Sequence, residues 1–347
     1  MVKVVINGRF LADRMQGVVR YSRELIEALD EVADGAIDLQ IAVPPDAHDV
    51  PYYKRIKINQ FGRRKGIAWE QIDLPTYLKK HSDAVCISLC NTRPIFARNC
   101  ITVVHDVMYA THPQYYNTVR NRLSRLWHMM QYGIIAAYDK KIITVSSFSK
   151  AEIEARYPKA EGKIVVIPNG WQHVLRYKEN KDWESKFPDL KSGQYFFSMA
   201  TLAKNKNYGW IIETARENPD ELFAIAGMKY ESIGENLPDN IRMLGYVDDA
   251  DACSLIKNCK AFVFPSFFEG FGLPPLEALA LGAECIVSNS SSIPEVMATS
   301  AHYVDPDKPC RDIEKLLASS IGEPEDALSR FDWNRSAEKL YKLIKDL

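Results

Sequence analysis

The sequence has few features of a metal-binding, secreted or membrane-spanning protein. Its seven cysteines form no C-x-x-C pair and no cluster with histidines at zinc-ligand spacing, which excludes the common structural zinc sites. An odd number of cysteines in a chain of 347 residues fits a reduced, cytoplasmic protein. No apolar run approaches the roughly 18 residues that span a bilayer, so any membrane contact is expected to be peripheral.

A net charge of one sign is also missing. Lysine and arginine number 44 and aspartate and glutamate number 45, so the overall charge predicts no nucleic-acid partner. The chain lacks the phosphate-binding pattern G-x-x-x-x-G-K-[ST], and no G-x-G-x-x-G follows its first apolar run at residues 2–6. The second absence disfavours a nicotinamide-dependent dehydrogenase.

Short apolar runs alternate with helix-period segments along the whole chain. The runs are residues 2–6, 39–43, 85–89, 100–106, 141–146, 163–168, 195–200, 222–227, 241–245, 261–266 and 284–289. Strands that alternate with helices build parallel sheets covered on both faces. Because the length suits two domains, the sequence predicts an α/β fold of two Rossmann-like, doubly wound domains facing each other across a cleft.

The most informative stretch is FPSFFEGFGLPPLEALALG, residues 264–282, which follows an apolar run and opens a helix. Pro274 and Pro275 suit the first helical turn, where a missing N–H costs nothing. Gly270 and Gly272 let the backbone approach a ligand and present free N–H groups beside a positively polarised helix N-terminus. Together these features predict an anion cradle.

Two glutamates flank this turn. Glu269 precedes it, and Glu277 follows eight positions later, inside the predicted first turn of the helix. Ionised carboxylates only accept hydrogen bonds and therefore suit sugar hydroxyls, which donate them. The residues alone leave an alternative open, in which the glycines form a tight turn and Glu277 complements the helix dipole.

The string EGFGLPPLEALALG, with its E-x7-E spacing, resembles the retaining glycosyltransferases of family 4, also described as glycosyl transferases group 1. Other segments match that family's pattern in the same order: VVHDVMYATHP, TVSSFSKAEI, VIPNG, SMATLAKNKNYGWIIETA, MLGYVDDADACSLIKNC and SNSSSIPEVMATSAHYVDP. The resemblance covers most of the chain and is strongest over residues 195–306. TLAKNKN, IPEV and the HD pair look closest to a bacterial mannosyltransferase-like branch.

The resemblance implies a GT-B fold with an acceptor-binding domain over residues 1–172 and a nucleotide-sugar-binding domain over 173–330. The last segment, 331–347, is then a helix that crosses back to the first domain. The donor-binding residues implied are Lys204, Lys206, Tyr246, Val247, Glu269, Gly270, Phe271, Gly272, Leu273 and Glu277. In this scheme Lys206 neutralises the leaving diphosphate, Glu269 contacts the donor sugar and Glu277 holds the ribose.

The first domain supplies the remaining candidates. The resemblance implies that His105, at a strand end beside Asp106, lies against the donor sugar and acts in catalysis together with Lys206 and Glu269. Gly17 belongs to a loop expected near the donor phosphate and the acceptor, and Asp106 is assigned to the same acceptor and phosphate region.

The sequence departs from the family at the phosphate site. Many members carry a basic residue six positions before the lysine, or an arginine just before it, and Ala200 and Asn205 occupy these positions here. Lys204 is the nearest substitute, although lysine and arginine are not equivalent at phosphates. Asn207 is expected to cap the following helix rather than contact substrate.

No metal site and no cofactor are predicted. Asp248, Asp249 and Asp251 have the look of a metal-binding D-x-D motif, but they open a helix, where aspartates cap free N–H groups. A metal is also unnecessary if Lys206 and a helix N-terminus hold the diphosphate. The nucleotide-sugar is a co-substrate.

We therefore expect a retaining, metal-independent hexosyltransferase that moves a sugar, first of all mannose from GDP-mannose, to a glycan or lipid-linked acceptor in bacterial surface polysaccharide synthesis. Lipopolysaccharide O-antigen is an example of such a product. Alternatives are another GDP- or UDP-sugar, a nucleotide-sugar epimerase, and a silent nucleotide-binding homologue.

Membrane contact is a separate expectation. The helical stretch 120–138 carries Arg120, Arg122 and Arg125 beside Leu123, Leu126, Trp127 and Met130. Such a helix suits the anionic inner face of a membrane or a pyrophosphate-linked lipid acceptor. A packed helix with a solvated basic side is the alternative.

Overall fold

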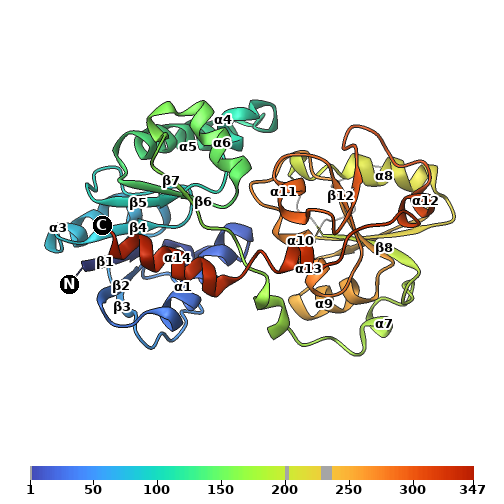
Figure 1. Ribbon diagram of the computed structural model, residues 1–347, viewed down its shortest axis with the longest axis horizontal. Helices are drawn as coiled ribbons and strands as arrows, with labels where there is room; N and C mark the ends of the chain where they lie inside the picture. The colour runs from blue at the N-terminus through green and yellow to red at the C-terminus, as the bar shows by residue number, and fades with distance from the viewer. Residues whose placement is uncertain (1, 200–202, 228–236) are drawn as a thin grey trace. The chain divides into compact units, whose positions relative to one another are not determined.

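The computed structural model describes residues 2–199, 203–227 and 237–347 and divides the chain into two compact units (Figure 1). The first unit is Met1–Gly170 together with Asp332–Leu347, and the second is Trp171–Phe331. Within the described ranges, no helix is both long enough and apolar enough to cross a membrane.

The first unit is built on a parallel sheet with strand order β3-β2-β1-β4-β5-β6-β7. Its strands are β1 (Val2–Asn7), β2 (Ile37–Val43), β3 (Lys57–Gln60), β4 (Val85–Ser88), β5 (Cys100–Val103), β6 (Lys141–Thr144) and β7 (Ile164–Val166). Val4, Val5 and Ile6 in β1 are all fully buried, which requires layers on both faces of the sheet.

Helices supply those layers. They are η1 (Gly8–Ala12), α1 (Gly17–Val32), α2 (Gly66–Ala68), the π-helical turn η2 (Trp69–Asp73), α3 (Leu74–Lys80), α4 (Met108–Thr111), η3 (Pro113–Tyr115), α5 (Val119–Tyr138), α6 (Ser147–Arg156), η4 (Pro158–Ala160) and α14 (Trp333–Lys345). Figure 1 shows α4, α5 and α6 on one side of the sheet and α1 with α14 on the other. The last helix of the chain therefore belongs to the first unit.

The second unit repeats the plan with the strand order β10-β9-β8-β11-β12-β13, again parallel throughout. Its strands are β8 (Tyr195–Met199), β9 (Leu222–Ala226), β10 (Ile241–Gly245), β11 (Ala261–Phe264), β12 (Cys285–Ser288) and β13 (His302–Val304). Its helices are η5 (Gln172–Arg176), α7 (Trp183–Lys186), η6 (Lys204–Lys206), α8 (Tyr208–Glu217), α9 (Asp249–Asn258), α10 (Leu273–Ala280), α11 (Ile293–Met297), α12 (Ile313–Leu317) and α13 (Glu325–Leu328).

The two parallel α/β sheets confirm the predicted fold class. Two short strands, β3 and β13, were not predicted, because β3 is a largely exposed edge strand and β13 has only three residues. The last segment, predicted as a helix over residues 331–347, forms α14, which begins at Trp333, where the Asp332 side chain accepts the Arg335 N–H as an N-cap.

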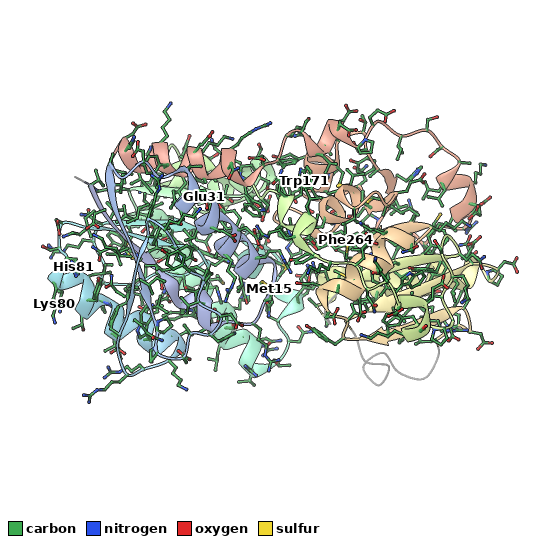
Figure 2. All side chains as sticks on the ribbon, turned by 90° about the horizontal axis from the view of Figure 1, so that it is seen from below. Met15, Glu31, Lys80, His81, Trp171 and Phe264 are labelled. Atoms are coloured by element: carbon green, nitrogen blue, oxygen red, sulfur yellow. The ribbon has the colours of Figure 1, made fainter. Side chains whose placement is uncertain are left out.

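Each sheet has one point at which the strand order reverses, between β1 and β4 in the first unit and between β8 and β11 in the second. Ligands of doubly wound sheets bind outside the carboxyl ends of the strands at such switch points. Figure 2 shows Met15, from the loop between η1 and α1, and His81, from the loop between α3 and β4, at opposite ends of the first unit.

Candidate active site

The loop after β11 lies at the switch point of the second unit and carries Glu269, and Glu277 lies in the helix α10 that follows it. Pro274 and Pro275 stand in the first turn of α10, as predicted from their missing N–H groups. Gly272 has φ +96°, and a Cβ there would lie 2.4 Å from Ile293 Cδ1. Only glycine fits this tight turn.

A run of serines between β12 and α11 fixes the backbone of this loop. The hydroxyls of Ser288, Ser290 and Ser292 donate to the carbonyl oxygens of Ser266, Phe267 and Glu269 at 2.6, 2.7 and 3.0 Å. The Glu269 N–H donates in turn to Ser291 Oγ at 3.0 Å. The SNSSS run is part of a segment that resembles the family, but the sequence alone assigns it no role. The structure shows that it positions the loop before α10.

Asn205, which replaces the arginine of other family members, also supports the loop. Its Nδ2 donates to the Phe268 carbonyl at 3.0 Å, its own carbonyl accepts the Phe267 N–H at 2.8 Å, and the side chain is buried. This position therefore contributes a backbone support instead of a positive charge. Ala200, the other departure, lies outside the described residues.

The capping role predicted for Asn207 is wrong. Asn207 precedes α8 in a left-handed conformation, φ 55°, and its side chain makes no capping hydrogen bond to that helix. Instead, Nδ2 donates to the carbonyl oxygens of Pro265 and Pro306 at 3.0 and 2.8 Å. Asparagine tolerates the left-handed region because its short amide bonds to nearby backbone, and here those bonds tie the loop to the end of β13.

Lys206 and Glu269 meet at this switch point. Lys206 Nζ donates to Glu269 Oε1 at 2.7 Å, and the two side chains are 19% and 13% exposed. The ammonium also lies 5.0 Å from the centre of the Phe264 ring at the end of β11. An incoming anion can reach the lysine, and an incoming hydroxyl can reach the glutamate.

Glu277 has a partner that was not identified from the sequence. His173 Nε2 donates to Glu277 Oε1 at 2.7 Å, and the imidazole is fully buried while the carboxylate keeps 14% exposure. No local pattern marks this histidine, because 104 positions separate the two residues. Glu277 lies one turn deeper in α10 than predicted, since the helix begins at Leu273.

The other predicted donor residues lie around this loop or at the end of β10. Lys204 shares the turn η6 with Lys206. Phe271 and Leu273 are buried, and Phe271 packs edge-on against Phe331. Phe271 can therefore contact a ligand only through its backbone. Tyr246 and Val247 directly follow β10, where Tyr246 is 89% exposed.

In the first unit, His105 and Asp106 lie just beyond β5 rather than at its end. Burial lowers the pKa of His105 from its usual 6.5 to about 4, although a hydrogen bond to the Leu89 carbonyl opposes the shift. That contact, 2.8 Å from Nε2, requires a proton on Nε2, because a carbonyl only accepts. His105 is therefore neutral near pH 7 with Nδ1 as an acceptor.

Asp106 and Gly17 are placed by local structure. The Asp106 side chain accepts the Met108 N–H at 2.8 Å and so opens α4. Gly17 begins α1 and is exposed, and a Cβ there would meet no atom within 4 Å. The packing at the start of this 16-residue helix therefore has room for a side chain and does not require glycine.

The aspartates before and inside α9 serve the helix. Asp248 is its N-cap and accepts the Asp251 N–H at 2.9 Å, as predicted. Asp251 is buried and bonds Asn180 and Lys186. Across the described part of the chain, no group of three or more His, Cys, Asp or Glu side chains is arranged to hold a metal ion.

Comparison with protein families gives two matches that together cover most of the chain. The model described as Glycosyltransferase Family 4 matches residues 15–172, and the model described as Glycosyl transferases group 1 matches residues 179–327. The second match includes Lys206, Glu269 and Glu277.

Three curated relatives are mannosyltransferases. An O-antigen chain mannosyltransferase B of Escherichia coli is 27% identical over 65% of this chain and 61% of its own. The O-antigen chain mannosyltransferase RfbU of Salmonella typhimurium is 25% identical over 95% and 94%. A GDP-mannose:cellobiosyl-diphosphopolyprenol alpha-mannosyltransferase of Komagataeibacter xylinus is 25% identical over 69% and 64%. The chain thus spans less than two thirds of the length of the Escherichia coli and Komagataeibacter relatives.

Solved structures share the fold. A sucrose-phosphate synthase from Thermosynechococcus elongatus superposes with a TM-score of 0.71 at 15% identity, covering 100% of this chain and 98% of that one. The glycosyltransferase WaaG, described as involved in lipopolysaccharide biosynthesis, gives 0.69 at 14% identity and covers 99% of both chains.

Proposed function

The chain belongs to the glycosyltransferases that combine a family 4 domain with a group 1 domain, and from this premise we propose that it transfers a sugar from a nucleotide-sugar to a glycan or lipid-linked acceptor. The product belongs to the synthesis of a surface polysaccharide. Three mannosyltransferases among the relatives, two of them named for the O-antigen chain, support this assignment.

The observation that carries the proposal is the ion pair of Lys206 and Glu269 at the β8/β11 switch point. In the reaction, Lys206 turns to the diphosphate and stabilises the negative charge that grows as the glycosidic bond breaks. Glu269 accepts hydrogen bonds from hydroxyls of the donor sugar, and the backbone N–H groups of Gly270, Phe271 and Gly272 add donors. Glu277, held by His173, accepts from the ribose hydroxyls.

We propose retention of the anomeric configuration without a metal and without another cofactor. The acceptor attacks the face that the diphosphate leaves, and a phosphate oxygen takes the acceptor's proton. Catalysis then comes from positioning and electrostatics, with no covalent bond to a side chain. Neutral His105, through Nδ1, accepts a hydrogen bond from a hydroxyl of the donor sugar. Tyr246 and Val247 lie by the base, and Lys204 supports the diphosphate.

The donor proposed first is GDP-mannose. The three mannosyltransferases described above favour mannose, and the name of the Komagataeibacter relative includes GDP-mannose. That relative's acceptor, a diphosphopolyprenol carrying cellobiose, favours a lipid-linked acceptor for this chain as well. With such an acceptor, we propose that the reaction takes place at the cytoplasmic face of a membrane.

One helix of the first unit suits that location. An exposed apolar stripe runs along α5. It consists of Val119, Leu123, Leu126 and Met130, whose exposed fractions are 76%, 63%, 58% and 43% in this order. No acidic residue occurs in α5, and Arg120 and Arg122 are exposed beside the stripe. We propose that this face binds an anionic bilayer. Leu123→Ser should reduce sedimentation with anionic vesicles, whereas Leu175→Ser, at an exposed leucine of the second unit, should not. Equal sedimentation of both variants would remove α5 from the proposal.

A donor screen in the presence of EDTA tests the function. GDP-mannose, GDP-fucose, UDP-glucose, UDP-galactose and UDP-N-acetylglucosamine are compared by thermal stabilisation and by release of the nucleoside diphosphate. GDP-mannose should stabilise the protein most and be slowly hydrolysed, and the first sugar product should keep the α-anomeric configuration by NMR. Conversion of the donor to an epimer without acceptor would instead favour an epimerase. Binding without turnover would favour a silent homologue.

A further inference from the structure

The first unit carries, at its own switch point, an ion pair that the proposed function does not use. Arg9 lies in η1, the helical turn that follows β1, and Thr92 lies in the loop that follows β4; the strand order reverses between these two strands. Glu70 reaches the same place from the π-helical turn, and Arg9 Nε lies 3.3 Å from Glu70 Oε1. The pair thus occupies the position where a doubly wound sheet binds its ligand.

Glu70 is fixed and inaccessible. Its side chain is 1% exposed. Oε1 accepts from Asn7 Nδ2 at 2.8 Å, and Oε2 accepts from Thr92 Oγ1 at 3.0 Å and from Gln71 Nε2 at 3.2 Å. A buried carboxylate with this many donors is stable where it stands, but it cannot touch a ligand. Glu70 can act only through Arg9.

The turn that presents Glu70 is unusual and is held in place by a buried tryptophan. The Trp69 ring is fully buried, and its indole N–H donates to the Phe61 carbonyl at 2.9 Å. Gly62, with φ +94°, passes so close that a Cβ there would lie 2.8 Å from Trp69 Cδ1. π-helical turns are rare, and they occur frequently at functional sites. The turn brings Glu70 to the carboxyl ends of the strands.

Arg9 keeps donors for a further partner. A guanidinium has five N–H donors. The contacts beyond Glu70 are long: Nη2 lies 3.4 Å from Thr92 Oγ1, and Nη1 lies 3.9 Å from Asp13 Oδ2. The side chain is 15% exposed, and Nε is buried without a hydrogen-bond partner of good geometry in the described chain. Glycine is needed before Arg9, because a Cβ at Gly8 would lie 2.5 Å from the Ala42 carbonyl oxygen.

Aromatic rings lie on the same side of the sheet. Burial lowers the pKa of His128, a hydrogen bond to the Ser124 carbonyl opposes this shift, and the charge of Arg9 adds to the lowering. His128 stacks on Tyr109 with ring centres 4.0 Å apart, and Tyr109 stacks on Tyr116 at 4.6 Å. Because Tyr109 is stacked between the other two rings, the group offers a ligand ring edges and polar atoms and not a free face of Tyr109.

We propose that Arg9 binds a phosphate or diphosphate group of the acceptor and that Glu70 is the positioning residue that aims it. The planar guanidinium can hold two phosphate oxygens at once, and the weakly held Asp13 is the contact that the anion replaces. Because Glu70 shares its charge among three other donors, the outer edge of Arg9 remains positive. This inference rests on the proposed function for the identity of the anion as part of an acceptor.

Calorimetric titration of the full chain tests the inference with three probes: farnesyl diphosphate, inorganic pyrophosphate and farnesol. Wild-type protein should bind farnesyl diphosphate and pyrophosphate, and it should still bind them when it is saturated with GDP. Farnesol, which lacks the diphosphate group, should not bind at this site. Arg9→Gln should weaken diphosphate binding at least tenfold. Glu70→Gln should weaken it several-fold and Arg9→Lys should restore little, while Arg63→Gln, at an exposed arginine of the same unit, should have no effect.

Two results would overturn the inference: unchanged diphosphate affinity in folded Arg9→Gln, or loss of pyrophosphate binding when wild-type protein is saturated with GDP. The second needs no variant and decides the matter if Arg9→Gln does not fold. Lys206→Ala distinguishes a diphosphate of the donor nucleotide from one of the acceptor. This variant should bind GDP more weakly and farnesyl diphosphate as tightly as wild type. Failure of the proposed function would look different: no nucleotide-sugar would bind, whereas Arg9-dependent diphosphate binding would remain.

Discussion

The two units share one architecture, and each has a cation paired with a glutamate at its switch point, but the pairs differ in which partner is accessible. In the second unit, Lys206 and Glu269 are both partly exposed and 2.7 Å apart. In the first, Arg9 is partly exposed whereas Glu70 is buried. A pair with two accessible members can separate so that each binds a different part of one ligand. A pair with a buried carboxylate offers only its cation.

The surroundings of the two pairs differ in the same sense. Serine hydroxyls and two asparagines hold the backbone of the loop before α10, and they leave the Glu269 carboxylate without a hydrogen bond from any of them. In the first unit the hydrogen bonds go directly to the Glu70 carboxylate. When hydrogen bonds hold only the backbone, the side chain is free to exchange its ion-pair partner for a ligand. When hydrogen bonds hold the carboxylate itself, this exchange is prevented. The predictions below test this contrast.

The largest effect is expected for Lys206→Ala. Loss of the charge that stabilises the leaving diphosphate should lower the rate of sugar transfer by about 10²- to 10³-fold, as for removal of one transition-state donor in other enzymes. The thermal midpoint should change little, because the side chain is partly exposed. Steady-state transfer assays with Lys191→Ala as the exposed-lysine control measure this. A rate within threefold of wild type would assign the diphosphate to another residue.

A smaller loss is expected for Glu277→Ala. Removing the acceptor of the ribose hydroxyls should weaken nucleotide binding by about 1.5 to 3 kcal/mol, which is roughly 10- to 150-fold in Kd. It also leaves His173 without its carboxylate, so some thermal stability should be lost. Titration with GDP measures the affinity, and Glu213→Ala at an exposed glutamate is the control. Unchanged affinity would contradict the role of Glu277.

The pH dependence of stability reports on His105. Because burial lowers its pKa to about 4, the folded state holds the imidazole neutral while the unfolded chain takes up a proton below about pH 6.5. The stability from this group is present above pH 6.5 and is lost as pH falls toward 4. Linkage gives a loss of about 2 kcal/mol between pH 7 and pH 5. Urea unfolding at both pH values should show a smaller loss in His105→Gln than in wild type or His81→Gln. An equal loss in all three would mean that other groups cause the pH dependence.

The smallest effect has an unusual sign. Glu269→Gln removes the carboxylate that occupies Lys206 in the ligand-free protein. The affinity for a nucleoside diphosphate, which has no sugar, should therefore rise about threefold to fivefold, or roughly 1 kcal/mol. Transfer should fall at the same time, because the sugar loses an acceptor. Weaker binding of the diphosphate in this variant would show that the pair does not have to separate.

Much of this arrangement is predictable from local sequence patterns. The alternation of apolar runs and helical segments predicts the two parallel α/β sheets correctly, and the prolines lie in the first turn of α10 as predicted, although Glu277 lies one turn deeper in the helix than predicted. Asp248 is recognisable as a cap because its partner N–H is three residues away. These features depend on short-range geometry, which a single sequence contains.

The features that were missed depend on contacts between distant positions. His173 lies 104 positions from Glu277, and Glu70 lies in a π-helical turn that no periodicity announces. Asn207 was misassigned because an asparagine directly before a helix suggests an N-cap. Its amide instead donates to the carbonyl oxygens of Pro265 and Pro306, in the loops that follow β11 and β13. Pairing across the fold is what a local pattern does not contain.

The most direct test of the contrast between the two switch points is a calorimetric titration of GDP into wild-type, Lys206→Ala and Arg9→Gln protein. We predict that Lys206→Ala weakens GDP binding at least tenfold and that Arg9→Gln changes it by less than about twofold, since we propose that residues of the second unit bind the nucleotide of the donor. Equal weakening in both variants, or weakening in Arg9→Gln alone, would contradict the assignment of the two pairs to two different substrates.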